Sequence, residues 1–164
     1  MNNRTLILGA VLAVGSVAPL RAQTRLSIGG GAGVVGSTES SLSDGSRGRV
    51  IMAQLLRGGL PFVAVGGEFN RWSRDSLSAN FVTGVVQAHI PLTGFLLKAG
   101  IGYGSGNPDG LGKINGPALE LGAGYDFTIP AAPIAITLFG NGLLAHASSR
   151  SLQTVVAGVA LTLR

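Results

Sequence analysis

The chain has 164 residues, a formal net charge of +5, no cysteine, and 46% hydrophobic against only 12% charged residues. Without cysteine there are no disulfides and no thiolate metal sites. The basic residues are scattered among acidic ones along the sequence, which argues against nucleic-acid binding. The 27 glycines would also suit a flexible polymer, but the apolar residues alternate in order. We therefore expect one folded domain in an apolar environment.

The first 22 residues have the pattern of a secretory signal peptide. A basic residue, Arg4, precedes the apolar run 5–18, and Ala22 offers a cleavage point before Gln23. An uncleaved anchor is the less favoured alternative, because this run is short for a membrane-spanning helix. We predict that residues 1–22 are removed, which takes away two arginines and lowers the charge to +3, and that 23–164 form the mature domain.

Alternation of apolar with small or polar residues predicts eight strands in chain order. They cover 24–37, 49–56, 62–72, 80–90, 95–104, 118–127, 134–147 and 152–164. The stretch 118–127 is the clearest, since five apolar residues from Leu119 to Phe127 fall on one face. Its ten residues match the roughly 9–11 tilted residues with which a strand crosses a bilayer.

The connections between these strands differ in length and composition. Segments 38–46, 73–78, 105–116 and 148–151 are polar and generally longer, whereas 58–61, 91–94 and 130–133 are four-residue turns rich in Gly or Pro. Bacterial outer-membrane barrels have this layout, with short periplasmic turns, longer external loops and both termini on the periplasmic side. Backbone groups in hydrocarbon also require a closed sheet. The predicted fold is therefore an all-β, eight-stranded antiparallel up-and-down transmembrane β-barrel.

Aromatic residues fall near both ends of the predicted strands. We expect them to form two sparse girdles at the membrane interfaces. The girdles are imperfect, because the alternation places Phe62 and Trp72 on the inward face. The short-turn end would carry Phe62, Phe95 and Phe127, and the long-loop end Trp72, Phe81 and Tyr103.

The inward faces carry a small polar set. An eight-stranded interior is filled by side chains and leaves no useful pore, and buried charges must pair. We therefore predict an interior network in which Lys98 pairs with Glu68 or Glu120. These two carboxylates could instead act as a general acid and base, an interpretation that we favour less. The predicted network comprises Glu68, Gln87, Lys98, Glu120, Asp126 and Asn141.

Two glycine-rich stretches, 29–33 and 100–104, superficially look like phosphate-binding loops. Neither is followed by a helical pattern or by a lysine placed to hold phosphate. Glycine on the inward face lets strands coil tightly. We interpret both stretches as bends of the barrel.

With these features the mature chain resembles, in pattern along nearly its whole length, the small outer-membrane β-barrels of the OmpA/OmpX type. The resemblance implies a non-enzymatic, monomeric outer-membrane protein with a structural or envelope-adhesion role through its external loops. Its implied partners are outer-membrane lipid, lipopolysaccharide and the outer-membrane assembly machinery, and its external partner stays open. We expect no cofactor and no metal site, because His89 and His146 fall on different strands. The chain ends in Arg164, where members of the family often end in an aromatic residue.

Two alternatives remain. His146-Ala147-Ser148 is similar to the His-x-Ser of the lipid A 3-O-deacylases, in which His146 would deprotonate Ser148. That family places its acid downstream, and no Asp or Glu follows Ser148, so only a remote acid such as Asp109 could serve. The second alternative is a soluble periplasmic lipocalin-like barrel, which would have apolar side chains inside and charges outside, with many more charges than this chain carries.

Overall fold

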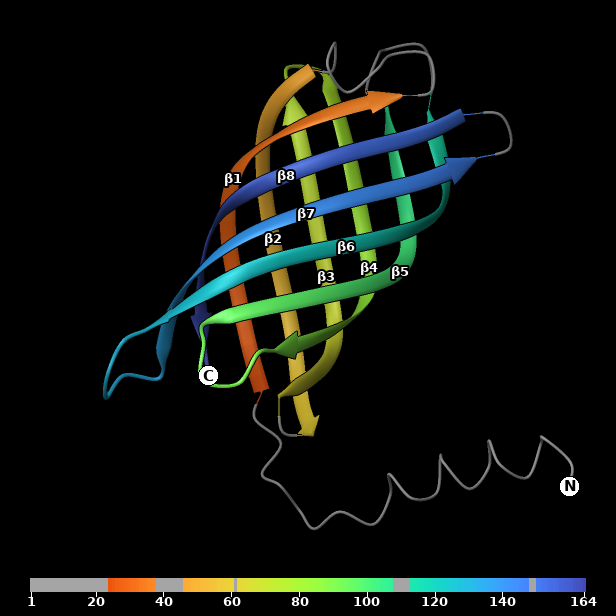
Figure 1. The fold of residues 1–164 in the computed structure, drawn as a ribbon. Coiled ribbons are helices and arrows are strands. Elements are labelled where there is room, and N and C mark those ends of the chain that lie inside the picture. The colour runs from red at the N-terminus through yellow and green to blue at the C-terminus, as the bar shows by residue number, and fades with distance from the viewer. Residues whose placement is uncertain (1–23, 38–45, 61, 108–112, 148–149) are drawn as a thin grey trace, which may run out of the picture.

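The computed structural model describes residues 24–37, 46–60, 62–107, 113–147 and 150–164, and within them the chain forms eight antiparallel strands. Each strand pairs with the next, and β1 also pairs with β8, so that the sheet closes on itself (Figure 1). The predicted fold class is thereby confirmed. The strands are β1 (Thr24–Ser37), β2 (Ser46–Leu60), β3 (Val63–Arg74), β4 (Leu77–His89), β5 (Phe95–Asn107), β6 (Ile114–Thr128), β7 (Ile134–Ala147) and β8 (Arg150–Leu163).

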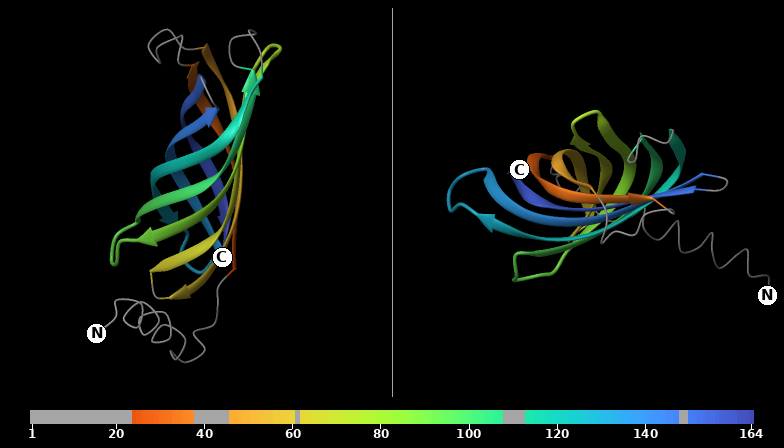
Figure 2. Two further views of the ribbon diagram at one scale, coloured as in Figure 1. Left: turned by 90° about the vertical axis from the view of Figure 1, so that its right-hand side faces the viewer. Right: turned by 90° about the horizontal axis from the view of Figure 1, so that it is seen from above.

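The barrel has two distinct ends. At the end drawn at the bottom of Figure 1, which we call the terminal end, β1 begins, β8 ends, and three turns connect β2 to β3, β4 to β5 and β6 to β7. The opposite end, the loop end, carries the other four connections. The strands cross the barrel axis obliquely (Figure 2), as closure of an eight-stranded sheet requires. Among the described residues no helix is long and apolar enough to cross a membrane.

Several strands are longer than predicted. The ladder between β2 and β3 continues through Gly58, so residues 61–62 connect these strands and the predicted turn 58–61 is wrong. At the loop end β5 and β6 still pair at Ser105–Asn115 and Gly106–Ile114, inside the segment predicted as a loop. The reason is that each strand here has paired neighbours on both sides, and ladder hydrogen bonds outweigh the turn propensity of Gly and Asn.

The predicted polar loop 73–78 is also wrong. Arg74 pairs with Leu77, which leaves a two-residue turn in which Asp75 takes a left-handed backbone with φ of 50°. Residues 147 and 150 pair in the same way across the β7–β8 connection. The greater length of the connections at the loop end is therefore confined to those joining β1 to β2 and β5 to β6. Phe62, Leu92 and Ala131, in the turns of the terminal end, are likewise left-handed.

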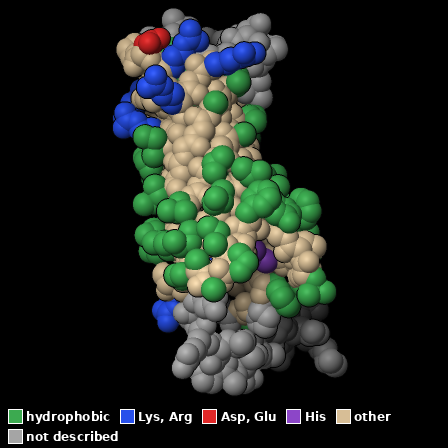
Figure 3. Space-filling model, turned by 90° about the vertical axis from the view of Figure 1, so that its left-hand side faces the viewer, with side chains coloured by type: hydrophobic (Ala, Val, Ile, Leu, Met, Phe, Trp, Pro, Cys, Tyr) green, Lys and Arg blue, Asp and Glu red, His purple; other side chains and the backbone are tan. Residues whose placement is uncertain are grey.

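The outer wall is apolar. Large hydrophobic side chains alternate outward on every strand, and Ile101 and Leu121 keep 71% and 68% of their surface exposed. Hydrophobic side chains cover much of the wall in Figure 3. Exposure on this scale costs a protein in water free energy at about 25 cal/mol per Å². The wall is thus built for hydrocarbon, the reverse of the pattern expected for a soluble lipocalin-like barrel.

The aromatic residues are distributed unequally between the two ends. Phe62, Phe95 and Phe127 lie at the terminal end, as predicted, and all three are exposed, so the inward face predicted for Phe62 is wrong. The Phe95 ring meets Tyr125 edge-on at 5.0 Å between centroids. Trp72 and Phe81, in contrast, are each only 1% exposed and lie inside the barrel. The inward face predicted for Trp72 is confirmed, whereas the girdle predicted at the loop end is wrong for Trp72 and Phe81, and only Tyr103 of that set is on the wall.

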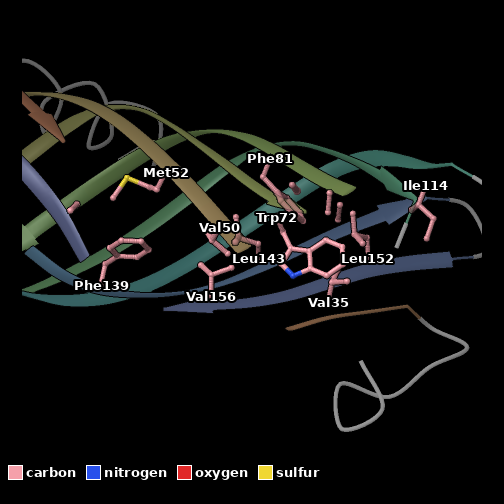
Figure 4. Close-up of a cluster of buried hydrophobic side chains, with 14 residues drawn as sticks. Val35, Val50, Met52, Trp72, Phe81, Ile114, Phe139, Leu143, Leu152 and Val156 are labelled. Carbon is pink, nitrogen blue, oxygen red and sulfur yellow. The ribbon is translucent and has the colours of Figure 1, made fainter. Parts of the chain in front are cut away.

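An apolar core fills the lumen toward the loop end, and Met52 and Phe139 extend it to the level of Lys98 in the middle (Figure 4). Trp72 lies at its centre among Val35, Leu143 and Leu152, and the indole Nε1 donates to the carbonyl oxygen of Gly33 at 3.1 Å. That bond satisfies the one polar atom of the ring. The core leaves the polar side chains for the middle and the terminal end of the lumen.

Candidate functional site

The middle of the lumen holds a buried ion network. Lys98 on β5 contacts both carboxylate oxygens of Glu68 on β3, with Nζ 2.5 Å from Oε1, and lies 3.2 Å from Oε1 of Glu120 on β6. The Lys98 side chain is 2% exposed, and neither carboxylate is exposed at all. One cation therefore lies between two carboxylates drawn from two other strands.

Amide and hydroxyl groups donate to both carboxylates, although Oε1 of Glu120 accepts no hydrogen bond from the described residues. Glu68 accepts from Nε2 of Gln54 at 2.6 Å, from Nδ2 of Asn70 at 2.8 Å and from Nδ2 of Asn141 at 2.9 Å. Glu120 accepts from the Thr83 hydroxyl at 2.5 Å. Such a network offers buried charges the partners they need, and it fills the lumen from one wall to the other. A general acid and base would instead need access to a substrate.

The six residues of the predicted network separate into two groups. Glu68, Lys98, Glu120 and Asn141 lie together in the middle of the lumen, as just described. Gln87 and Asp126 are also buried but belong to a second cluster at the terminal end. This division could not be predicted from the sequence, because strand stagger in a tilted barrel decides which inward positions share a level.

Asp126 is the centre of the terminal cluster. Its carboxylate accepts from Arg25 Nη2 at 2.5 Å, from Arg164 Nη2 at 2.8 Å and from the Thr137 hydroxyl at 2.5 Å, and His89 Nε2 lies 3.4 Å away. The cluster lines a cavity of about 310 Å³ that opens at the terminal end. Sequence reasoning missed Arg25, His89 and Arg164 as members, although all three have the inward parity of their strands.

The residues of the esterase alternative do not form a catalytic arrangement within the described part of the chain. His146 is exposed on the outer wall, where it borders a shallow apolar groove with Ile101, Leu119 and Leu144. Ser148 and Asp109, like the predicted signal peptide, lie outside the described residues. No group of three or more His, Asp or Glu side chains that could hold a metal ion occurs in the described ranges.

The loop end carries a surface feature that the sequence analysis did not find. Arg47 and Arg49 on β2 and Arg71 on β3 are exposed and have outward parity. Arg71 pairs with Ile51 and Arg49 with Ser73, so Arg49 and Arg71 are diagonal neighbours on one face. Antiparallel pairing thus gathers arginines that are 22 residues apart in the sequence. Figure 3 shows Lys and Arg side chains grouped at this end.

Comparison with known proteins identifies the fold. No family model and no curated protein sequence matches the chain. Among solved structures, Neisserial surface protein A superposes with a TM-score of 0.66 at 6% identity, over 87% of this chain and 97% of that one. Ail, the attachment invasion locus protein of Yersinia pestis, solved with the heparin analogue sucrose octasulfate, gives 0.59 at 14% identity over 88% and 100%. The N-terminal β-barrel domain of Pseudomonas aeruginosa OprF gives 0.54 at 13% identity over 87% and 100%.

None of these descriptions names an enzyme. The chain has the fold of the small eight-stranded outer-membrane β-barrels.

Proposed function

We propose that the mature chain is an integral protein of the bacterial outer membrane that presents its loop end at the cell surface in a structural or adhesive role. The observation that carries this proposal is the combination of an apolar outer wall with a lumen filled by core and ion network. The wall suits a bilayer, and the filled lumen argues against transport. The surface at the loop end is therefore the part of the barrel that can contact an external partner.

The orientation follows from the topology. Barrels of this class keep both termini and the short turns on the periplasmic side. The terminal end of this chain has both the start of β1 and the end of β8. The longest connections, 38–45 and 108–113, would then face outward.

An anionic polymer is the first class of external partner to test. Arg74 and Lys113 are exposed at the loop end, and Ail, which shares this fold, was solved with a heparin analogue. Sulfated polysaccharides bind exposed cations mainly through charge, so that binding weakens as salt rises.

The first experiment is to fold residues 23–164 into detergent and into phosphatidylcholine vesicles. A closed barrel should give a β-rich circular dichroism spectrum, a gel mobility that shifts on boiling, and no steady ion conductance in a planar bilayer. Solubility without detergent, or mobility that heating leaves unchanged, would overturn the membrane assignment.

The adhesive role needs a separate test. The variant Arg74→Gln/Lys113→Gln should still shift on boiling but should be retained less on immobilised heparin, because it removes two exposed cations at the loop end. Equal retention by the original chain and by this variant would show that Arg74 and Lys113 do not make the contact.

A further inference from the structure

We propose that Arg47, Arg49 and Arg71, the external arginine cluster, bind the phosphate groups of an anionic lipid in the leaflet at the loop end. The inference rests on the proposed membrane insertion but goes beyond it, because it assigns a ligand and three residues on the wall of the barrel. It concerns the side of the barrel, where lipid lies, and not the connections that face the exterior.

Backbone register places the three side chains within reach of one headgroup. Arg47 and Arg49 are two residues apart on β2 and so project from the same face. Arg71 is the diagonal neighbour of Arg49 across the β2–β3 ladder, a position about 7–8 Å away in antiparallel sheets. A phosphorylated headgroup can contact guanidinium groups at such spacings through different oxygens.

The carboxylates of the described residues do not neutralise the external arginine cluster. Glu68, Glu120 and Asp126 are buried in the lumen. Asp75, at the loop end, lies 3.7 Å from Arg74 and not beside the three arginines. The remaining acidic residues belong to connections outside the described ranges. An anion at the wall would therefore meet three guanidinium groups whose neighbours on the described strands do not neutralise them.

Apolar surface lies directly beside the cluster, toward the terminal end. Ile51 and Leu55 on β2 keep more than half of their surface exposed on the same outward face, and Phe69 on β3, two residues from Arg71, keeps 36%. A ligand that fits both regions has an anionic head and hydrocarbon chains. A sulfated polysaccharide would match the charge but would leave the apolar surface unused, and for this reason we favour a phosphorylated lipid.

The residue type fits the same ligand. Arginine presents a planar fork of N–H donors that matches two phosphate oxygens, whereas lysine offers a point charge. Arginines near a membrane interface also extend their apolar stems along the wall and keep the charged head at headgroup level. Each cation near an anionic lipid surface contributes about a fivefold gain in affinity.

The test measures lipid retained by the folded barrel. The chain is folded in phosphatidylcholine vesicles that contain diphosphorylated lipid A, extracted with mild detergent and analysed by native mass spectrometry. We expect the original chain to retain diphosphorylated lipid A but not lipid A from which both phosphates have been removed. The double variant Arg49→Gln/Arg71→Gln should bind about 25-fold more weakly, and Arg49→Lys/Arg71→Lys should fall between the two.

Arg57→Gln is the matched control. Arg57 is exposed on the same outward face of β2 but at the terminal end, and its variant should retain lipid A as the original chain does. Each variant is first checked for a heat-dependent gel shift, so that loss of folding is not mistaken for loss of the site. If the original chain itself shows no shift, the proposed membrane insertion fails rather than the lipid site.

Equal retention of diphosphorylated lipid A by the original chain and by Arg49→Gln/Arg71→Gln would overturn the inference. If that variant also lost heparin binding, the cluster would be assigned to an anionic polymer instead.

Discussion

At the scale of single residues, Lys98 decides whether the middle of the lumen is stable. It is the cation that lies between Glu68 and Glu120, and all three side chains are buried. Removing one partner of a buried ion pair leaves an uncompensated charge and typically costs about 3–5 kcal/mol. We expect Lys98→Met to lower the free energy of unfolding by about that amount, measured by urea titration in vesicles.

The control for this prediction removes the charges as well. Adding Glu68→Gln and Glu120→Gln to Lys98→Met should recover most of the lost stability, because no buried charge is then left without a partner. A Lys98→Met variant that unfolds at the same urea concentration as the original chain would contradict the network as the source of stability.

Gly122 allows Lys98 to cross the lumen. A Cβ at this position would lie 2.5 Å from Oδ1 of Asn141 and 2.6 Å from Cε of Lys98. Gly122→Ala should therefore displace both network side chains and lower the free energy of unfolding by about 1–3 kcal/mol. Gly142 on the neighbouring strand is the control, since a Cβ there would approach nothing closer than 3.9 Å. The same urea titration measures both variants, and equal effects would contradict the prediction.

The sequence could predict which residues face inward but not which of them meet. Parity alone assigned Glu68, Lys98 and Glu120 to the lumen, because alternation fixes the face of each residue along a strand. Whether Lys98 contacts one carboxylate or both depends on the stagger between β3, β5 and β6, which no local pattern encodes. The external arginine cluster was missed for the same reason, since Arg49 and Arg71 become neighbours only through the β2–β3 register.

At the scale of elements, the β1–β8 seam closes the barrel, and glycine makes it possible. A Cβ on Gly31 would lie 2.0 Å from the carbonyl oxygen of Ala157 and 2.6 Å from the Cα of Gly158, both on β8. These are backbone atoms, so the clash cannot be relieved by a side-chain rotation. The glycine-rich stretch 29–33, interpreted from the sequence as a bend, thus includes positions at which β8 leaves no room for a side chain on β1.

We expect Gly31→Ala to weaken closure of the barrel. The unheated form should lose its faster gel mobility at a lower temperature than the original chain, because β1 must move away from β8. The adjacent Gly30→Ala is the control: its Cβ would lie 3.4 Å from the nearest atom, the carbonyl oxygen of Val50. If both variants lose the faster gel mobility at the same temperature, the close approach of β1 and β8 is not what limits closure.

Element boundaries were predicted well where the chain crosses the wall and poorly at several connections, most of them at the loop end. The strand 134–147 agrees with β7 residue for residue, because its apolar alternation runs unbroken between turn signals. The predicted loops 73–78 and 105–116 failed because Ser, Asn and Gly there extend the ladders beyond the apolar wall. Turn propensity is a local property, whereas the pairing that overrides it comes from neighbouring strands.

At the scale of the whole molecule, polarity is inverted relative to a soluble barrel. The wall is apolar and the middle of the lumen is ionic, so hydrocarbon outside and a hydrogen-bonded interior stabilise the same closed sheet. Low charge and alternation were enough to predict this arrangement. The length of the apolar band, the part of the wall that faces hydrocarbon, can be estimated only when the outward residues at both of its edges are known.

The band on β2 gives the last prediction. Arg49 and Arg57 are exposed on the outward face of this strand and bracket its apolar residues. Eight residues at about 3.3 Å each, tilted by about 40°, span about 20 Å along the membrane normal. Because mismatch between the band and the bilayer costs free energy, the chain should fold in higher yield in dilauroyl than in dioleoyl phosphatidylcholine vesicles, as read from the heat-modifiable gel band.

A variant tests whether the band is the cause. Arg57→Leu extends the apolar surface of β2 toward the terminal end, so it should narrow the difference in yield between the two bilayers. Equal yields for the original chain in both lipids would mean that the arginines extend far enough along the wall to cover the mismatch. An unchanged difference in Arg57→Leu would place the limiting edge of the band on another strand, where Phe95 and Tyr103 bound the outward face of β5.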